Sequence, residues 1–537
     1  MSTTAASTSA LASGLTEIAW AAFALTLIAG VGALKLLTPF DGDQALFLYF
    51  AQAIDHGEKL YVDVWDMKQP GVFWFYWLGG KLFGSSELGV KLLELGWFLG
   101  FAVCLILCLR RTFVHPWLSS VAAAAALGSY YAFAGTRELT QAEILLSFPM
   151  FLAAWLLACD YARSATAAAG RMLAGGCAAI AVVFKLFYAP IFVAFVLVTI
   201  FTLHRRGAQN ATWLGTGIAV LGPFTLGVAA VLGVVSAILW QQGIFAELLW
   251  NSFVYPFHAL HTAAIEVDTG RLLRNSFWLL ATMAPWLPFA LLAAPRITHQ
   301  NEPVLTRLMV TWILVTAVLI VLQRLMFWKY HFLLLFVPLT VLAARGIDLL
   351  LIWLASPELR RRWLTAPVLT LLWAIPAMSA ILFFTQRQAE ELHLLAQGGK
   401  PAGIEGYRDA VGREYGWIRH QLLGLRNGGG EPIYVFGNPL VYLITERRQA
   451  IAINGWSWEA YPKEHWEALP GALAAARPAY IFVDPLNEEL ISENSRRVRE
   501  FLDTQYALVK ETGRGRLYGR LSPAPDAAPD IGWHPHL

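Results

Sequence analysis

The sequence predicts a polytopic α-helical membrane protein that ends in a small α/β domain. Hydrophobic residues make up 57% of the chain and charged residues only 14%, whereas soluble domains carry about 25% charged residues. The apolar residues gather in blocks, several of which reach the roughly 20 residues that a membrane-spanning helix needs. After residue 385 the blocks give way to short β-branched and aromatic runs that alternate with amphipathic segments.

The apolar blocks predict about eleven transmembrane helices within residues 17–385. The blocks lie at residues 17–37, 88–109, 117–134, 142–159, 172–184, 187–203, 213–240, 273–294, 304–322, 332–354 and 364–385. Residues 1–16 lack the basic flank of a signal peptide and are predicted to be disordered. The fifth and sixth blocks are short, so the alternative is one long helix over 172–203.

The placement of arginine decides between these alternatives. With a cytoplasmic N-terminus and two short helices, the inner loops carry "LRRTFVHP", "DYARSATAAAGR" and "LHRRGA". A single helix over 172–203 would instead place "HRRG" and "LRRRW" on the outer face. The positive-inside rule therefore favours eleven helices and an extracytoplasmic C-terminal domain.

Residues 386–521 are predicted to form that extracytoplasmic α/β domain. "EPIYVFGNP" and "RPAYIFVDP" are predicted strands, and "FGNP" is interpreted as an ordinary strand-end turn. The predicted helices are "GYRDAVGREYGWIRHQLLGL", "KEHWEALPGALAAA" and "NEELISENSRRVREFL". Strands that alternate with helices are typical of an α/β domain. The tail, residues 522–537, is predicted to be disordered.

Two further helices, at about residues 41–56 and 244–262, are predicted to lie along the outer membrane surface. The first follows "PFDGD", which places Asp41 and Asp43 at its N-terminus. Carboxylates are favourable at helix N-termini, and an N-cap accounts for one of them. A second carboxylate beside the hydrocarbon boundary is costly unless it has a function.

The predicted topology places several other ionisable residues on the same outer face. They are Asp63, Asp66 and Lys68 in "YVDVWDMKQPG", Glu143, Lys185, and Lys329 and His331 in "QRLMFWKYHF". This grouping suits transfer of a sugar from a lipid phosphate, in which an Asp acts as general base and cations stabilise the departing phosphate. Lys185, Lys329 and His331 are the main candidate cations, and Arg137 and Arg324 are weaker ones.

The stretch "DGDQALFLYFAQAIDHGEKLYVDVWDMKQPG" resembles the first outer loop of the GT-C integral membrane glycosyltransferases. The resemblance is to bacterial members of the glycosyltransferase family 39 type, which includes protein O-mannosyltransferases and the aminoarabinose transferases that modify lipid A. An Asp-Glu pair begins the surface helix in that group, and Asp43-Gln44 takes its place here. The glutamine departs from a pair of metal-binding carboxylates.

Four further stretches extend the resemblance: "TRELTQAEILLSFPMFLAAWLL", "AVVFKLFYAPIF", "FWKYHFLLLFVPLTVLAARGID" and, in the outer α/β domain, "EPIYVFGNPLVYLITERR". It implies an inverting transferase of the plasma membrane with an extracytoplasmic active site, in which Asp43 is the base and Asp41 lies beside it. Glu143 would hold the acceptor or the sugar, while Lys185 and the Lys329–His331 pair would bind the donor phosphate. Asp63, Asp66 and Lys68 complete the expected substrate-binding residues.

The expected partners are the lipid bilayer, a polyprenyl-phosphate sugar donor and a hydroxyl acceptor on a lipid, glycan or protein. The net charge is only +3, which does not favour nucleic-acid binding, and no GxxxxGK[ST] phosphate loop is present.

Asp41-Gly-Asp43 has the DxD form that suits Mg²⁺ or Mn²⁺. We nevertheless expect no obligatory metal, with Asp41 and Asp43 as ligands if a divalent cation is used.

Two other functions remain as alternatives. The first is a transporter of a lipid-linked substrate, although transporters usually keep ionisable residues near the membrane midplane. The second is a lipid-linked oligosaccharide ligase or polymerase, for which residues 241–272 offer His258, His261 and Arg271.

Overall fold

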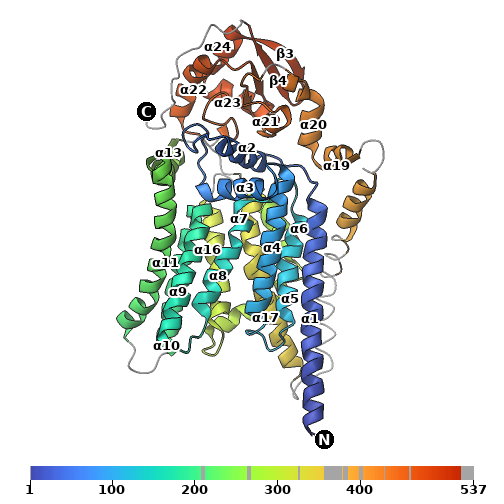
Figure 1. The fold of residues 1–537 in the computed structure, drawn as a ribbon, viewed down its shortest axis with the longest axis vertical. Coiled ribbons are helices and arrows are strands. Elements are labelled where there is room, and N and C mark those ends of the chain that lie inside the picture. Colours follow the sequence, from blue (N-terminus) through green and yellow to red (C-terminus); the bar gives the residue numbers. More distant parts are fainter. Residues whose placement is uncertain are drawn as a thin grey trace. The chain divides into compact units, whose positions relative to one another are not determined.

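The computed structural model divides into two compact units (Figure 1). It describes residues 2–206, 212–262, 268–323, 327–355, 378, 382, 385–397, 403–427, 430–458 and 461–521. Unit 1 comprises Met1–Leu36, Lys91–Gly233 and Asp268–Gln397, and unit 2 comprises Leu37–Val90, Val234–Val267 and Gly398–Leu537. The first outer loop and the segment around residues 244–262 therefore fold with the C-terminal residues, a grouping that a division at residue 386 does not capture.

Unit 1 is built from helices. Its α-helices, two of which extend into unit 2, are α1 (Ser2–Lys35), α4 (Glu87–Leu109), α5 (Leu118–Ala123), α6 (Ser129–Phe133), α7 (Ala142–Leu145), α8 (Ser147–Ala158), α9 (Ser164–Phe184), α10 (Ala189–Arg206), α11 (Trp213–Gln242), α14 (Thr269–Met283), α15 (Leu287–Ala293), α16 (Val304–Leu322) and α17 (Phe336–Leu354). A π-helical turn, Ala124–Gly128, joins α5 to α6. Short 3-10 turns at Leu186–Tyr188, Ala294–Thr298 and Lys329–Leu335 adjoin α10, α15 and α17.

Seven helices in the described part are long and apolar enough to cross a membrane, or eight if one bent pair counts as a span. The bent pair is α14 with Leu287–Thr298, at 86°. Two shorter apolar helices, Leu118–Phe133 and Ala142–Ala158, coincide with two more of the predicted spans. The eleventh predicted span, 364–385, lies almost wholly outside the described residues. The chain is thus a multi-pass membrane protein, with seven or eight long spans described rather than eleven.

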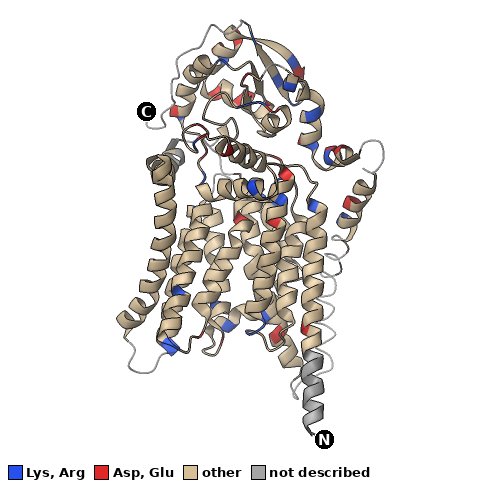
Figure 2. Ribbon diagram, in the orientation of Figure 1, with Lys and Arg blue, Asp and Glu red and all other residues tan. Residues whose placement is uncertain are grey.

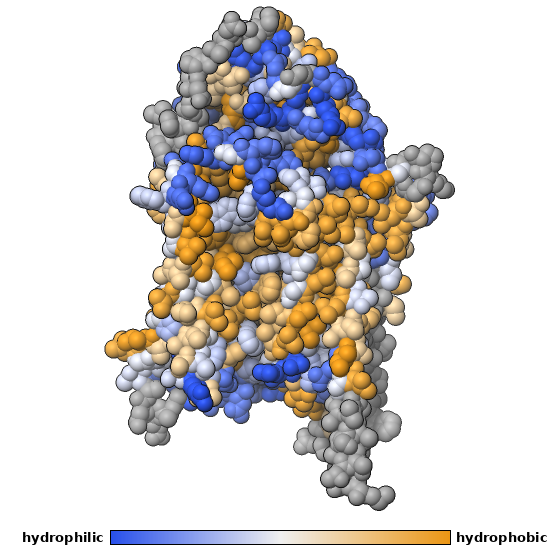
Figure 3. Space-filling model, viewed as in Figure 1, coloured by the Kyte–Doolittle hydropathy of each residue, from blue (hydrophilic) through white to orange (hydrophobic). Residues whose placement is uncertain are grey.

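The surface of these helices fits a bilayer. Large apolar side chains such as Leu214, Trp240 and Phe277 are each more than 70% exposed. Lys and Arg gather toward the ends of the helices in Figure 2, and apolar side chains cover much of their visible face in Figure 3. Exposure on this scale is costly in water and favourable in hydrocarbon.

The two short helices predicted around Lys185 are separate. α9 ends at Phe184, and Lys185 adopts an extended conformation, with φ −158° and ψ 103°, before α10 begins at Ala189. Residues 2–16, by contrast, continue α1 instead of being disordered. This stretch contains four alanines, Ala5, Ala6, Ala10 and Ala12, and alanine is the strongest helix former.

Unit 2 contains a four-stranded sheet with helices around it. The strands are β1 (Tyr434–Phe436), β2 (Tyr480–Val483), β3 (Tyr506–Thr512) and β4 (Gly515–Arg520), in the order β1-β2-β4-β3. β1 and β2 are parallel, with Tyr434 opposite Ile481, and the remaining pairs are antiparallel. β1 and β2 lie in the two runs predicted as strands. The β3–β4 hairpin is not among the predicted strands; most side chains of β3 are exposed, including the apolar Leu508 and Val509.

The helices of unit 2 come from three stretches of the chain. They are α2 (Asp43–Asp55), α3 (Pro70–Phe83), α12 (Phe245–Leu249), α13 (Tyr255–Thr262), α19 (Gly403–Val411), α20 (Arg413–Leu422), α21 (Leu440–Thr445), α22 (Lys463–Ala476), α23 (Pro485–Asn494) and α24 (Arg496–Gln505). A π-helical turn, Trp250–Val254, joins α12 to α13, and a 3-10 turn, Leu423–Asn427, follows α20. The predicted C-terminal helix over 487–502 is split at Ser495, whose side chain accepts a hydrogen bond from Val498 N and so caps α24.

We predict that α9 and α11 depend on glycine where they cross. A Cβ on Gly175 would lie 1.9 Å from the carbonyl oxygen of Phe224, whereas one on Gly176 would meet Val231 at an ordinary 3.6 Å. Gly175→Ala should therefore destabilise the protein by about 1–3 kcal/mol through overpacking. Gly176→Ala, the matched control, should be neutral or stabilising. Thermal unfolding in detergent measures both, and equal melting temperatures for the two variants would contradict the helix crossing.

Candidate active site

The predicted site residues fall into two groups, one in each unit. Asp41, Asp43, Asp63, Asp66 and Lys68 belong to unit 2. The others, Glu143, Lys185, Lys329 and His331, belong to unit 1.

In unit 2, Asp43 is the first residue of α2 and is only 9% exposed. The residue before it, Gly42, has φ +61° and stands at the N-cap, and no side chain caps this helix. The N-cap explanation for Asp41 or Asp43 is therefore wrong. Gln44 closes the first turn instead, because its Oε1 accepts a hydrogen bond from Asp41 N at 3.2 Å. The helix N-terminus still favours the negative charge of Asp43 electrostatically.

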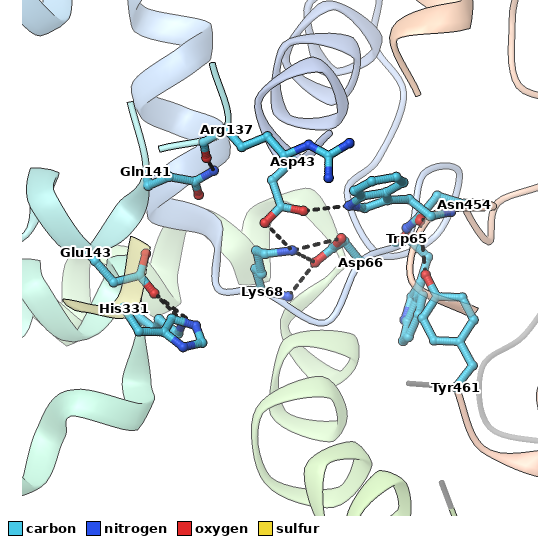
Figure 4. Close-up of polar contacts among 12 residues, drawn as sticks. Asp43, Trp65, Asp66, Lys68, Arg137, Gln141, Glu143, His331, Asn454 and Tyr461 are labelled. Carbon is cyan, nitrogen blue, oxygen red and sulfur yellow. Dashed lines mark hydrogen bonds and ion pairs between the residues drawn. The ribbon is translucent and has the colours of Figure 1, made fainter. Parts of the chain in front are cut away.

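Lys68 lies between two of these carboxylates (Figure 4). Its Nζ is 3.9 Å from Asp43 Oδ2 and 3.4 Å from Asp66 Oδ1. The backbone N–H of Lys68 also donates to Asp66 Oδ1 at 2.9 Å. Burial raises the pKa of Asp66 above its usual range, and the Lys68 charge opposes this shift. The single Lys68 ammonium thus forms ion pairs with two buried carboxylates.

Two side chains from the C-terminal part of unit 2 also contact the "DGD" segment. The indole Nε1 of Trp456 donates to Asp43 Oδ1 at 2.7 Å. The amide of Asn438 donates to Asp41 Oδ1 at 2.6 Å and accepts from Gly42 N at 3.3 Å. Asn438 also caps its own turn, accepting from Leu440 N at 3.0 Å, so "FGNP" is a strand-end turn with an additional role. Local sequence gave no signal for either contact.

Asp63 has a different environment from the other carboxylates of its loop. Its side chain is exposed, and Oδ2 accepts a hydrogen bond from Lys59 N at 2.7 Å. That contact makes it a turn-capping residue, a role sufficient to explain an Asp at this position.

The loop that carries Asp66 and Lys68 is anchored by aromatic residues. Trp65 is fully buried, and its ring packs edge-on against Tyr461 at 5.6 Å and His465 at 5.2 Å. Its carbonyl accepts from Asn454 Nδ2 at 2.8 Å (Figure 4). Burial lowers the pKa of His465 to about 4. The imidazole is therefore neutral at physiological pH and serves as packing.

In unit 1, three polar side chains converge on one oxygen of Glu143. Lys185 Nζ lies 2.5 Å from Oε1, and the Tyr188 hydroxyl donates to it at 3.4 Å. His331 Nε2 is 3.7 Å from the same oxygen (Figure 4). Glu143 and His331 are buried, with exposures of 1% and 2%. The structure thus brings together three of the four residues predicted for this group.

Lys329, the fourth residue, forms a separate pair. Its Nζ is 3.4 Å from Glu138 Oε2 and 4.4 Å from the centre of the Trp278 ring. Arg137, a weaker candidate, uses its backbone carbonyl to accept from Gln141 Nε2 at 2.8 Å. Arg324 lies outside the described residues.

The "DGD" carboxylates give mixed support for a bound cation. Within the described ranges, no group of three His, Cys, Asp or Glu side chains is arranged to hold a metal. The Oδ1 atoms of Asp41 and Asp43 each accept from a neutral N–H donor. A divalent cation bound through these two Oδ1 atoms would compete with those donors.

No protein-family model and no curated protein matches the chain, but several solved structures do. ArnT from Cupriavidus metallidurans bound to undecaprenyl phosphate is 14% identical, covering 93% of this chain and 97% of ArnT, with a TM-score of 0.51. Its apo state is 15% identical over the same shares, with a TM-score of 0.53. The oligosaccharyltransferase AglB from Archaeoglobus fulgidus is 11% identical over 93% of this chain and 74% of AglB, with a TM-score of 0.48. The chain has the GT-C fold of ArnT.

We predict that His465 makes the protein sensitive to acid. Its pKa is about 4 in the folded chain, below its ordinary value of 6.5, so between these pH values the unfolded chain binds a proton that the folded chain does not. Its contribution to stability is complete above pH 6.5. That contribution falls by about 1.4 kcal/mol for each pH unit down to pH 4.

Melting temperatures between pH 7 and pH 4.5 test this prediction. His465→Phe keeps an aromatic ring that does not titrate, so it should lose less stability over this range than the wild type. His56→Gln, at an exposed histidine, is the control and should behave as the wild type does. Identical pH dependence for His465→Phe and the wild type would contradict the assignment.

Proposed function

We propose that this protein is a glycosyltransferase that moves a sugar from a polyprenyl-phosphate carrier to a hydroxyl acceptor. The reaction would take place on the outer face of the plasma membrane and invert the anomeric carbon. The fold supports this proposal, since ArnT shares it over nearly the whole chain and has been solved bound to undecaprenyl phosphate.

The observation that carries the proposal is the setting of Asp43. Its carboxylate is buried at the first residue of α2, one oxygen is held by the Trp456 N–H, and the other faces the Lys68 ammonium at 3.9 Å. A carboxylate fixed in this way is suited to accept a proton from an acceptor hydroxyl.

The Glu143 cluster suits the phosphate side of the reaction. Lys185 and His331 converge on one carboxylate oxygen, and a phosphate oxygen offers the same negative charge and hydrogen-bonding capacity. In the proposed role Glu143 holds these groups in place, and they stabilise the charge of the departing phosphate. Lys329 would add a further cation from its pair with Glu138.

The proposed step balances without a cofactor. The acceptor oxygen forms a bond to the anomeric carbon while the bond from that carbon to the carrier phosphate oxygen breaks. The acceptor proton passes to Asp43, and the polyprenyl phosphate leaves with the electron pair. Attack from the face opposite the leaving group inverts the configuration.

The ligase and transporter alternatives have less support from the described residues. For the ligase, Arg271 is engaged with Asp268 at 3.3 Å and lies 4.6 Å from the centre of the Trp328 ring. His258 is exposed on α13, and nothing is described of the His261 side chain. For the transporter, the charged clusters lie at helix ends and in loops rather than along the long spans, as Glu143 in α7 and Lys68 show.

We predict that Asp43→Asn abolishes sugar transfer, because the amide cannot accept the acceptor proton. The assay follows labelled sugar from a panel of synthetic polyprenyl-phosphate sugars in membranes carrying either protein. The wild-type rate should fall by at least about 100-fold in the variant. Asp55→Asn, at the exposed last residue of the same helix α2, is the matched control and should retain activity within about twofold.

The same assay with EDTA tests the metal prediction. Transfer should be unchanged if no divalent cation is obligatory, and loss that Mg²⁺ or Mn²⁺ restores would show that one is needed. Equal transfer by wild type and Asp43→Asn would remove Asp43 as the base. Folded wild type that accepts no donor in the panel would favour the ligase or transporter.

We also predict that Lys185→Met slows transfer by roughly 100-fold or more, since it removes a cation from the leaving phosphate. Lys81→Met is the control, because Lys81 is half exposed and pairs with Asp55. Steady-state rates at saturating donor separate the two variants. If Lys185→Met turns over as fast as the wild type, Lys185 only stabilises the Glu143 cluster and does not act on the leaving phosphate.

A further inference from the structure

The "DGD" segment and residues 438–456 form one hydrogen-bonded arrangement within unit 2. Asn438 follows β1, and Trp456 lies between β1 and α22. These two side chains donate to Asp41 Oδ1 and Asp43 Oδ1 across about 400 residues of sequence, with separations of 397 and 413. Each carboxylate of the motif thus has a neutral donor from the C-terminal part of the chain.

Gly42 allows the indole to approach this closely. Its φ of +61° is a conformation that side chains rarely adopt, and a Cβ at this position would lie 2.9 Å from Cζ2 of Trp456. The indole therefore packs against the glycine that separates the two carboxylates. A glycine in the motif is explained by this contact as well as by the turn.

The segment that carries Trp456 is itself held in place. Trp456 N donates to Asn454 Oδ1 at 3.0 Å, and Asn454 is buried, with an exposure of 1%. Asn454 also accepts from the Tyr461 hydroxyl at 3.0 Å and donates to the Trp65 carbonyl at 2.8 Å. A Cβ on Gly455 would lie 1.7 Å from the carbonyl oxygen of Val435 in β1, so the segment lies directly against the sheet.

We infer that Trp456 is a positioning residue for Asp43, and that the C-terminal sheet domain thereby forms part of the active site instead of only covering it. This inference rests on the proposed function. An indole N–H can donate but not accept, so Asp43 Oδ1 stays an acceptor. A proton taken by Asp43 is therefore directed onto Oδ2, the oxygen that faces Lys68.

The geometry also limits rotation of the carboxylate. A hydrogen bond to one oxygen, from a side chain that is itself fixed, defines the direction of the other oxygen. General-base catalysis depends on this direction, and a displacement of about 1 Å can cost roughly 100-fold in rate. Binding of the sugar donor has no such dependence, so loss of the indole N–H should affect turnover more than donor affinity.

Trp458 offers a matched comparison two residues away. It is fully buried, and its Nε1 donates to the Tyr434 hydroxyl at 3.2 Å within the same domain. Phenylalanine at either position removes one indole N–H and keeps an aromatic ring. Only the Trp456 substitution removes a donor to Asp43.

The test measures kcat and donor KM for the full-length wild type, Trp456→Phe and Trp458→Phe in the labelled-donor assay, with melting temperatures for each. We expect Trp456→Phe to lower kcat by roughly 10- to 100-fold with donor KM within about twofold. Trp458→Phe should lower the melting temperature and leave kcat within about twofold. Unchanged kcat in Trp456→Phe, or a loss matched by Trp458→Phe, would overturn the inference.

If Trp456→Phe does not fold, Gly42→Ala tests the same inference, because the added methyl pushes an intact indole away from Asp43. A fall in kcat at constant donor KM would again support it, and unchanged kcat would overturn it. A wild type that folds but transfers no sugar would overturn the proposed function itself. If the wild type transfers sugar and the Trp456 variant is equally active, only the role of Trp456 is overturned and the proposed function stands.

Discussion

The arrangement around the first outer loop depends on one ion pair network, the Lys68 ammonium between Asp66 and Asp43. A buried carboxylate without a cation is strongly disfavoured, and burial already raises the pKa of Asp66. Lys68 places its positive charge between the two carboxylates and opposes the rise in the pKa of Asp66. The contacts that fix this loop, from Trp65 to Asn454 and His465, therefore also hold Lys68 beside Asp43.

In unit 1 the charges are arranged the other way, with one carboxylate facing several donor groups. There one carboxylate oxygen, Glu143 Oε1, faces Lys185, Tyr188 and His331. Glu143 carries the negative charge that pairs with Lys185. In the proposed reaction a donor phosphate would present oxygens of the same kind to Lys185. Lys185 lies outside both helices, because its extended backbone separates α9 from α10.

Much of the membrane part could be predicted because hydropathy is a local property of the chain. The break at Lys185 and strands β1 and β2 were predicted from short patterns of this kind. Local patterns failed where tertiary contacts decide the structure. The hydrogen bond from Trp456 to Asp43 joins residues 413 positions apart. Gln44, viewed in the sequence as a missing carboxylate, proved to close the first turn of α2.

The most direct test of the proposed reaction is a cryo-electron microscopy structure of the protein with a polyprenyl phosphate bound in a lipid nanodisc. We expect the phosphate to lie within hydrogen-bonding distance of Lys185 Nζ, and the distance from Lys185 to Glu143 to increase as the phosphate takes its place. A phosphate bound beyond the reach of Lys185, His331 and Lys329 would contradict the proposed donor site. So would failure of any polyprenyl phosphate to bind the folded protein.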